Sequence, residues 1–157
     1  MFDALLLLIV ANGTPVIGRK LFGRYFAYPL DFHLKAPDGY PWFGKSKTFL
    51  GILLAILFTA ITAWLIGLHW QLGATIGALA MAGDLLSSFI KRRFGLPSSS
   101  QVPGVDQIPE SLLPLWVCSQ PLALGWLEVM IAVIIFWIVE ILLSRILYQL
   151  HIRNRPY

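Results

Sequence analysis

The sequence predicts an all-α integral membrane protein, and its length, composition and mean hydropathy point to that class together. The chain has 157 residues, of which 57% are hydrophobic and only 13% are charged. Its mean hydropathy is +0.73. A soluble domain usually carries about 25% charged residues, and a globule of this size could not bury so much apolar surface. The composition excludes a disordered chain, a coiled coil and an ordinary soluble enzyme. We expect one domain over residues 1–157.

Five apolar segments are candidate membrane spans. No residue from Thr48 to Gly83 is charged, and these 36 residues are too many for one crossing, because about 20 residues span the hydrocarbon. We expect a break near His69 and Trp70, since histidine is polar and tryptophan suits the interface. The first segment is short and could be tilted or re-entrant. The expected spans are residues 4–18, 48–68, 72–90, 111–127 and 128–150.

The basic residues predict which side of the membrane each loop faces. All twelve Lys and Arg fall in three groups, within residues 19–47, at 91–93 and from Arg145 onward. With five crossings all three groups lie on one side, whereas four crossings would put the last group opposite. The positive-inside rule makes that side cytoplasmic. We therefore expect a multi-pass protein of the cell membrane with its N-terminus outside. Two polar cytoplasmic loops, 19–47 and 91–110, would form the site.

Several single features have structural interpretations. The net charge of +4 fits cytoplasmic anchoring, so we expect no nucleic-acid partner. Cys118 is the one cysteine and is expected to pack in the interior. Gly73 and Gly77 form a GxxxG pattern that favours close helix packing. Glu140, deep in the last span, is expected to pair within the bundle or to reach an interface.

The end of the third span carries the most distinctive polar stripe. Asp84 lies about two turns inside the expected end of this helix, where a carboxylate usually has a partner or a function. Asp84, Ser88, Lys91 and Arg92 share one helical face by their spacing. The stripe could present a carboxylate, a hydroxyl and cations to a phosphate–metal cluster. The alternative is a structural Asp–Lys pair with basic side chains that snorkel to the interface.

Two further segments could complete such a site. Asp106 and Glu110 precede the fourth span, and a carboxylate there that faces Asp84 would help to hold Mg²⁺. The alternative is an ordinary turn before a helix, where acidic residues are favoured. Lys47 and Thr48 open the second span, where free backbone N–H groups favour phosphate. The alternative there is cytoplasmic anchoring by basic residues.

Five motifs in order resemble the CDP-archaeol synthases, a membrane cytidylyltransferase family related to the bacterial phosphatidate cytidylyltransferases. These motifs are Asn12 with Pro15–Val16, Asp31 with Asp38–Gly39, Gly44–Thr48 with Gly51, Gly83–Asp84 through Ser88 to Arg93, and Asp106–Gln107. The resemblance implies five helices and an enzyme that joins CTP and a lipid phosphate, with release of pyrophosphate. The family's usual lipid is unsaturated archaetidic acid, a glycerol phosphate with two ether-linked geranylgeranyl chains.

The resemblance also implies roles for individual residues. Catalysis would depend on Asp84, Asp106 and Lys47, and Mg²⁺ would bind to Asp84, Asp106 and Glu110. The expected substrate- and phosphate-binding residues are Asn12, Asp31, Asp38, Lys45, Thr48, Ser88, Lys91, Arg92, Arg93 and Gln107. The expected partners are CTP, a lipid phosphate with two long hydrophobic chains, the bilayer and, as an open possibility, a second copy of the chain.

The sequence departs from the family pattern at two points. Leu50 occupies a position where the family usually has Arg, and Glu110 follows Pro109 where a second Asp is usual one position earlier. Both changes touch phosphate or metal binding. Two other functions therefore stay open, a non-catalytic membrane scaffold and a transporter subunit for an anionic lipid. Only the enzyme should require CTP and Mg²⁺ and release pyrophosphate.

Overall fold

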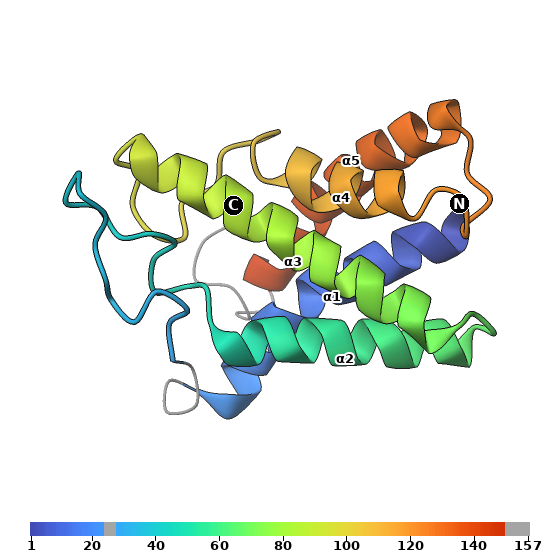
Figure 1. Cartoon of the computed structure of the whole chain (residues 1–157), viewed down its shortest axis with the longest axis horizontal. Helices are drawn as coiled ribbons and strands as arrows, with labels where there is room; N and C mark the ends of the chain where they lie inside the picture. Colours follow the sequence, from blue (N-terminus) through green and yellow to red (C-terminus); the bar gives the residue numbers. More distant parts are fainter. Residues whose placement is uncertain (24–27, 150–157) are drawn as a thin grey trace.

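The computed structural model describes residues 1–23 and 28–149 of the chain, and these form an all-helical bundle (Figure 1). Arg24, Arg153 and Arg155, which contributed to the expected side of the membrane, lie outside the described residues. Within the described part the only β-structure is two isolated bridges. The helices are α1 (Phe2–Phe22), α2 (Phe49–Leu65), α3 (Trp70–Arg93), α4 (Gln107–Val117) and α5 (Trp126–Gln149). The all-α fold class is confirmed.

Three of the five helices are long and apolar enough to cross a membrane. These are α1, α3 and α5, with 21, 24 and 24 residues. Helix α2 is also apolar but has 17 residues, and α4 has 11. The short first span expected from the sequence is longer in the structure, because α1 continues through Pro15 to Phe22.

The chain breaks between α2 and α3 close to the point expected from the sequence. Helix α2 ends at Leu65 and α3 begins at Trp70. Gly67 lies between them with φ of +83°, a left-handed conformation that glycine adopts at little cost. Its N–H donates to the carbonyl of Trp64, and the N–H of Leu68 donates to that of Ala63. These bonds satisfy carbonyl groups at the end of α2.

Helix α4 differs most from the sequence expectation of 111–127. It starts four residues earlier and ends at Val117, where the N–H of Cys118 donates to the carbonyl of Pro114 at 2.9 Å. The helix could not continue far beyond this point, because Pro121 has no N–H to donate to the carbonyl of Val117 and disfavours helical conformation at Gln120. Residues 118–125 form turns that lead into α5.

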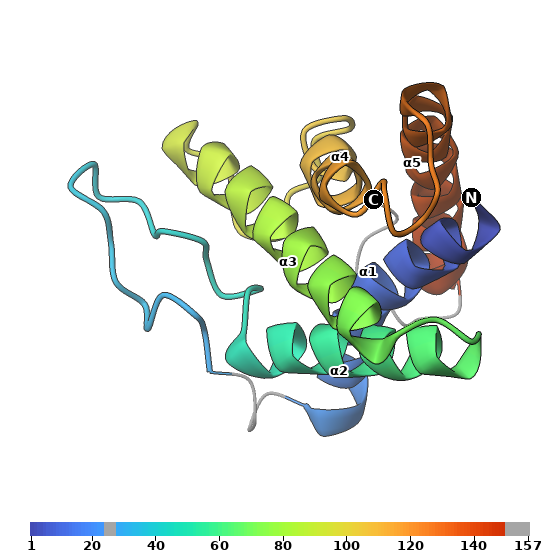
Figure 2. The ribbon, with the colours of Figure 1, turned by 45° about the vertical axis from the view of Figure 1, so that its right-hand side comes forward.

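Helix α3 packs against α1, α2 and α4, while α5 packs against α1 and α4 (Figures 1 and 2). Small residues bring α2 and α3 together. A Cβ at Gly73 would lie 2.5 Å from the Cβ of Ala63, and a Cβ at Gly77 would lie 3.0 Å from the Cα of Ile56. The GxxxG pattern therefore serves close packing within the chain. The buried core includes Leu7, Leu8, Ile76, Leu115, Val129 and Phe136.

The closest approach of α3 to α4 occurs at Gly83, directly before Asp84. A Cβ at Gly83 would lie 2.5 Å from the carbonyl carbon of Pro109 and 2.6 Å from the Cα of Glu110. Both are backbone atoms, so they cannot move aside as a flexible side chain could. The glycine thus allows Asp84 on α3 and Glu110 on α4 to lie near each other.

Gly83→Ala is expected to destabilise the protein, although alanine usually stabilises a helix relative to glycine. The added methyl must push α4 away from α3, and overpacking of this kind costs about 1–3 kcal/mol. Thermal unfolding in detergent measures the effect. Gly13→Ala on α1 is the matched control, since nothing lies within 4 Å of a Cβ at that position. Equal unfolding temperatures for the two variants would contradict the proposed contact.

A long loop, residues 28–48, lies at the end of the bundle where α3 finishes (Figures 1 and 2). Figure 2 shows it extending beyond the helices on the same side as the C-terminal turn of α3. The loop returns to the bundle beside α2, where the N–H of Leu30 donates to the carbonyl of Lys47 at 2.8 Å. The arrangement of helices thus leaves most of the polar sequence motifs at one end.

Candidate active site

Asp31 organises the long loop between α1 and α2. Its carboxylate accepts hydrogen bonds from the backbone N–H groups of Gly44, Phe43 and His33, at 2.8, 3.2 and 3.1 Å. The side chain is buried, with 6% of its surface exposed. The sequence placed Asp31 among the binding residues, whereas its contacts in the structure hold the loop together. One of these contacts shapes the turn immediately before Lys45 and Lys47.

The pKa of Asp31 lies below its usual value of 3.8. Burial alone would raise the pKa, but the three backbone N–H groups and the nearby His33 favour the charged form and outweigh burial. A carboxyl with a lowered pKa adds stability above its unfolded-state pKa and loses it as the pH falls through the folded-state value. The loop should therefore stay ordered at neutral pH and loosen at a pH below about 4.

Asp31→Asn is expected to reduce the protection of the Gly44 and Phe43 amides from hydrogen exchange at pH 7. The neutral amide accepts these hydrogen bonds more weakly, and the carboxylate bonds are charge-assisted. Protection factors for residues 28–48, measured from pH 7 down to pH 3, give both effects. Asp3→Asn at the start of α1 is the control and should leave the loop unchanged. Unaltered protection in Asp31→Asn would show that the carboxylate does not hold the turn.

Arg93 fastens the outer part of the loop to the end of α3. Its guanidinium lies 2.7 Å from Asp38 and donates to the carbonyl of Pro41 at 2.7 Å. It also lies 5.0 Å from the ring centre of Phe89, which stacks on Trp42. Asp38 and Arg93 were both predicted to bind substrate. In the structure they bind each other, so they anchor the loop.

The first ion pair of the site joins the loop to the middle of the bundle. Lys47 Nζ lies 2.6 Å and 2.5 Å from the two carboxylate oxygens of Asp84. The two side chains are 20% and 22% exposed, so the pair is mostly but not fully buried. Thr48 follows as the N-cap of α2, where its Oγ1 accepts a hydrogen bond from the N–H of Gly51 at 3.1 Å. That cap fixes the start of α2 beside Lys47.

A second ion pair lies at the end of α3. Lys91 Nζ is 2.5 Å from Asp106 Oδ1 and donates to the carbonyl of Ser100 at 2.7 Å. The other oxygen of Asp106 accepts from the N–H of Val102 at 2.9 Å. The side chains of Lys91 and Asp106 are 9% and 12% exposed. Asp84 thus pairs with Lys47 and Asp106 pairs with Lys91, and all four were predicted from the sequence as site residues.

Arg92 is the most buried cation in this region, with 2% of its surface exposed. Its Nη2 makes a long hydrogen bond of 3.3 Å to Ser100 Oγ. Within the described part of the chain, Nε and Nη1 have no hydrogen-bond acceptor. Gly44 lies alongside, and a Cβ there would come 3.5 Å from Nη1. Arg92 therefore offers unused, desolvated donors to an anion, which is costly unless an anion binds.

Two carboxyl groups lie deeper in the bundle. Glu110 on α4 is 3% exposed and shares a hydrogen bond with Glu140 on α5. The charges of Asp84 and Lys47 also act on Glu110. From the sequence alone, Glu140 is expected only to have a structural role. A single carboxyl group in an apolar helix was the sequence feature that indicated a partner for it.

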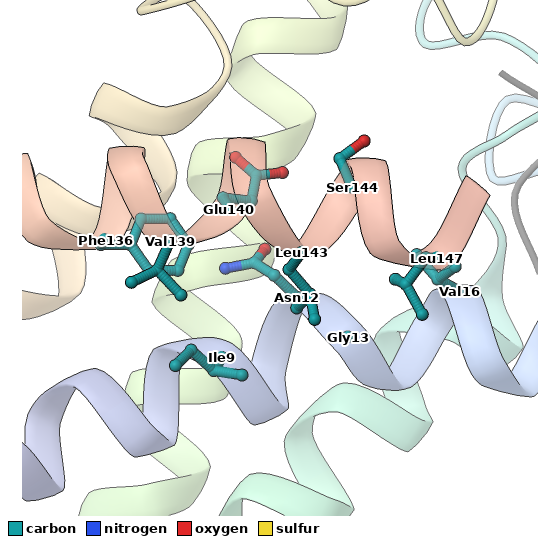
Figure 3. A pocket seen from close by; sticks show the side chains of 10 residues that line it. All are labelled: Ile9, Asn12, Gly13, Val16, Phe136, Val139, Glu140, Leu143, Ser144 and Leu147. Atoms are coloured by element: carbon teal, nitrogen blue, oxygen red, sulfur yellow. The ribbon is translucent and has the colours of Figure 1, made fainter. Parts of the chain in front are cut away.

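An apolar cleft opens between α1 and α5 beside this carboxyl pair (Figure 3). Its cavity volume is about 20 Å³, so α1 and α5 lie close together along it. Its lining is mostly apolar but includes Asn12, Glu140 and Ser144. In Figure 3 the side chain of Asn12 points from α1 toward α5. Asn12 Nδ2 also donates to the carbonyl of Leu8 at 3.1 Å.

The structure therefore brings together some predicted residues and separates others. The long loop, α3 and the residue before α4 supply five of them: Lys47 pairs with Asp84, Lys91 pairs with Asp106, and Arg92 lies beside Gly44 of the loop. Ser88 is buried one turn from Asp84. Gln107 is fully buried and accepts from the N–H of Gly104 at 2.8 Å, so it shapes the turn after residue 102. The side chain of Lys45 is exposed and forms no ion pair with any described carboxylate.

Comparison with known proteins identifies the class to which this fold and site belong. The family model described as CarS-like CDP-archaeol synthase matches residues 2–157. A CDP-archaeol synthase of Sulfurisphaera tokodaii is 33% identical over 95% of this chain and 90% of its own length. One of Sulfolobus acidocaldarius is 31% identical over 95% of this chain and 91% of its own.

A solved structure gives the same result for the fold. It is described as an intramembrane enzyme for archaeal membrane lipid biosynthesis, and it matches with a TM-score of 0.75 and 26% identity over 90% of each chain. The comparisons thus define the class: a CTP-dependent nucleotidyltransferase with the fold of an intramembrane enzyme. The chain belongs to the CDP-archaeol synthase family, so the resemblance noted in the sequence is confirmed.

Proposed function

We propose that this protein transfers CMP from CTP to unsaturated archaetidic acid, with formation of a CDP-lipid and pyrophosphate. Family membership supports the reaction class. The observation that carries the proposal is the convergence of Lys47–Asp84, Lys91–Asp106 and Arg92 at one end of an apolar bundle. Both reactants are polyanions, so a cluster of partly buried cations is the chemistry that would gather them.

The proposed topology places this cluster on the cytoplasmic side. All five helices would cross or enter the bilayer, with the N-terminus outside and residues 19–47 and 91–110 in the cytoplasm. The positive-inside rule supports this orientation, because the Lys and Arg groups of the sequence all lie in those loops and at the C-terminus. CTP is made and kept in the cytoplasm, so the proposed orientation also lets it reach the site.

We infer that Asp84 and Asp106 hold Mg²⁺. Their carboxylates are hard oxygen donors, and each already contacts a cationic ammonium group. No group of three or more His, Cys, Asp or Glu within the described residues could hold a metal by itself. Mg²⁺ commonly binds through one or two carboxylates together with substrate phosphates, and this donor set fits that pattern. Glu110 is a third candidate ligand, although it would first have to release Glu140.

The reaction needs little from the protein beyond positioning and charge. An oxygen of the lipid phosphate attacks the α-phosphorus of CTP, and the bond from this phosphorus to the bridging oxygen of the β-phosphate breaks. That oxygen leaves with pyrophosphate. A phosphate monoester has a second pKa near 6, so the attacking oxygen is already anionic at neutral pH and needs no general base. Bound Mg²⁺ would neutralise the triphosphate and stabilise the leaving group.

The chain's own side chains would hold the phosphates. Lys47 and Lys91 supply point charges, whereas Arg92 supplies a planar fork that can bind two oxygens at once. The unused Nε and Nη1 of Arg92 are the strongest structural support for this role. Three further residues would act indirectly, because they hold the loop that carries Lys47. These are Asp31, Asp38 and Arg93.

The lipid would enter sideways from the bilayer through the cleft between α1 and α5. Its apolar lining suits a hydrocarbon chain, and α1 and α5 would have to separate to admit one, because the cavity volume is about 20 Å³. Glu140 in its wall lies beside Glu110, on which the charges of Asp84 and Lys47 also act. Asn12 would then lie near the polar end of the lipid. This placement puts the lipid phosphate on the same side of the bundle as the proposed nucleotide site.

Pyrophosphate release by purified protein in detergent tests the proposal. The assay supplies CTP, Mg²⁺ and one lipid phosphate at a time, namely unsaturated archaetidic acid, its saturated form or diacyl phosphatidic acid. We expect release only with lipid present and fastest with the unsaturated ether lipid. Fastest release with the diacyl lipid would assign a different substrate. Failure to bind CTP would leave a scaffold or a lipid transporter subunit as the function.

A further inference from the structure

We propose that Lys47 and Lys91 are exchangeable counter-ions that occupy the cation positions of Asp84 and Asp106 until nucleotide and metal arrive together. Each lysine would then move from its carboxylate to a phosphate oxygen. The inference rests on the proposed function and adds an order of events to it. While the nucleotide is absent, the two lysines would occupy the positions at which a metal ion could bind to these carboxylates.

The geometry of the first pair carries the inference. Lys47 Nζ contacts both oxygens of Asp84, at 2.6 and 2.5 Å. An ammonium group in that position occupies the place between the two oxygens where a cation bound by the same carboxylate would sit. A divalent ion cannot share that place with it, because the two cations would repel each other at short range. Metal binding in that position between the two oxygens therefore requires Lys47 to leave.

The second pair repeats the arrangement with different surroundings. Lys91 Nζ lies 2.5 Å from Asp106 Oδ1, while Oδ2 is already held by the N–H of Val102. Lys91 is thus the cation beside the oxygen that the backbone does not hold. Lys91 also donates to the carbonyl of Ser100, which can keep the side chain nearby after the exchange. Each of the two carboxylates is therefore paired with a different lysine.

A displaced lysine needs a new anion. The side chains in these pairs are between 9% and 22% exposed, so an ammonium group left alone there would be poorly solvated. Leaving one charge of a buried pair without a partner is strongly unfavourable. The phosphates of CTP can accept both lysines, and the nucleotide then offsets the cost of opening the pairs. Metal and nucleotide should consequently increase each other's affinity by the same factor.

Permanent structural ion pairs would behave differently. If Lys47 and Lys91 only stabilise the fold, their removal leaves a destabilised protein without a gain in metal affinity. If they are counter-ions that the metal replaces, their removal exposes a carboxylate that a metal can bind directly. Metal affinity in the absence of nucleotide therefore separates the two cases, and it does not depend on catalytic turnover.

The test is Mn²⁺ binding to purified protein without nucleotide, measured from the electron paramagnetic resonance signal of free Mn²⁺. We expect weak binding to the wild type and about tenfold tighter binding to Lys47→Met and to Lys91→Met. Methionine keeps the unbranched shape and removes the charge. Lys35→Met, an exposed lysine of the same loop, is the matched control and should bind as the wild type does. Added CTP should tighten Mn²⁺ binding more in the wild type than in either variant.

Mn²⁺ affinities of both variants equal to that of the wild type would overturn the inference. Thermal unfolding checks that each variant is folded, and the two lysines give independent tests if one variant is unstable. The double variant Lys47→Met/Asp84→Asn must lose the gain in affinity, and a gain that persists would place the metal elsewhere and also overturn it. Pyrophosphate release by the wild type separates this outcome from a failure of the proposed function.

Discussion

Asp84→Asn is expected to lower the rate of CDP-lipid formation by about 100- to 1,000-fold while the protein still inserts and folds. Asparagine keeps the size of the side chain and removes its charge. The variant loses a proposed metal ligand and the anion that Lys47 contacts through both oxygens. Loss of one preorganised group that stabilises charge in a transition state costs a factor of this order.

The structure indicates that the fold should tolerate this change. The amide oxygen of asparagine can still accept a hydrogen bond from the Lys47 ammonium group, so the substitution weakens this contact without leaving the ammonium group with no acceptor. Packing of α3 on α4 depends on Gly83 rather than on the carboxylate itself. Initial rates with saturating CTP and lipid, together with gel filtration in detergent, measure activity and folding separately. Asp3→Asn at the exposed start of α1 is the matched control, and wild-type activity in Asp84→Asn would remove Asp84 from the mechanism.

Arg92→Lys is expected to weaken CTP binding by about tenfold to a hundredfold. Lysine keeps the positive charge but cannot reproduce the planar pair of donors, and a bidentate contact is not conserved in that exchange. A charged hydrogen bond in a desolvated site contributes about 1.5–3 kcal/mol, which corresponds to this range of affinity. The burial of Arg92 and its unused Nε and Nη1 are the structural reasons to expect a specific contact there.

Equilibrium binding of CTP in detergent measures this effect directly. Arg145→Lys on α5 is the control, because that side chain is exposed and lies outside the proposed phosphate site. We expect the control to bind CTP as the wild type does. If Arg92→Lys binds CTP with unchanged affinity, its guanidinium does not hold the triphosphate and serves only to pack the end of α3.

Sequence patterns predicted the helical membrane fold because apolar length and the lack of charge are direct physical requirements of a span. The uncharged stretch after Thr48 and the break near His69 both matched the structure. The limits of α4 were harder to predict, since hydrophobicity continues through residues 118–125 after the helix has ended. Pro121 prevents a helix from continuing through this stretch, and a hydropathy profile does not show that backbone effect.

The sequence indicated which residue types gather in the candidate site, but it did not indicate which of them form ion pairs with each other. Helical spacing placed Asp84 and Lys91 on one face, and a structural Asp–Lys pair was one alternative. In the structure Asp84 instead binds Lys47, which lies 37 residues earlier, and Lys91 binds Asp106. Spacing within one helix cannot reveal which loop folds over its end. The Glu110–Glu140 contact was missed for the same reason, because it joins two helices whose relative rotation depends on packing.

Transfer of label from CTP to lipid tests the central claim most directly. Purified protein in detergent is supplied with Mg²⁺, unsaturated archaetidic acid and CTP labelled at either the α- or the γ-phosphate. The proposed reaction predicts that the α-label moves into the organic-soluble lipid fraction while the γ-label appears only in pyrophosphate, in equal amounts. If the α-label stays in water-soluble products, or the γ-label enters the lipid, the chain does not transfer CMP to this lipid and the proposed reaction is wrong.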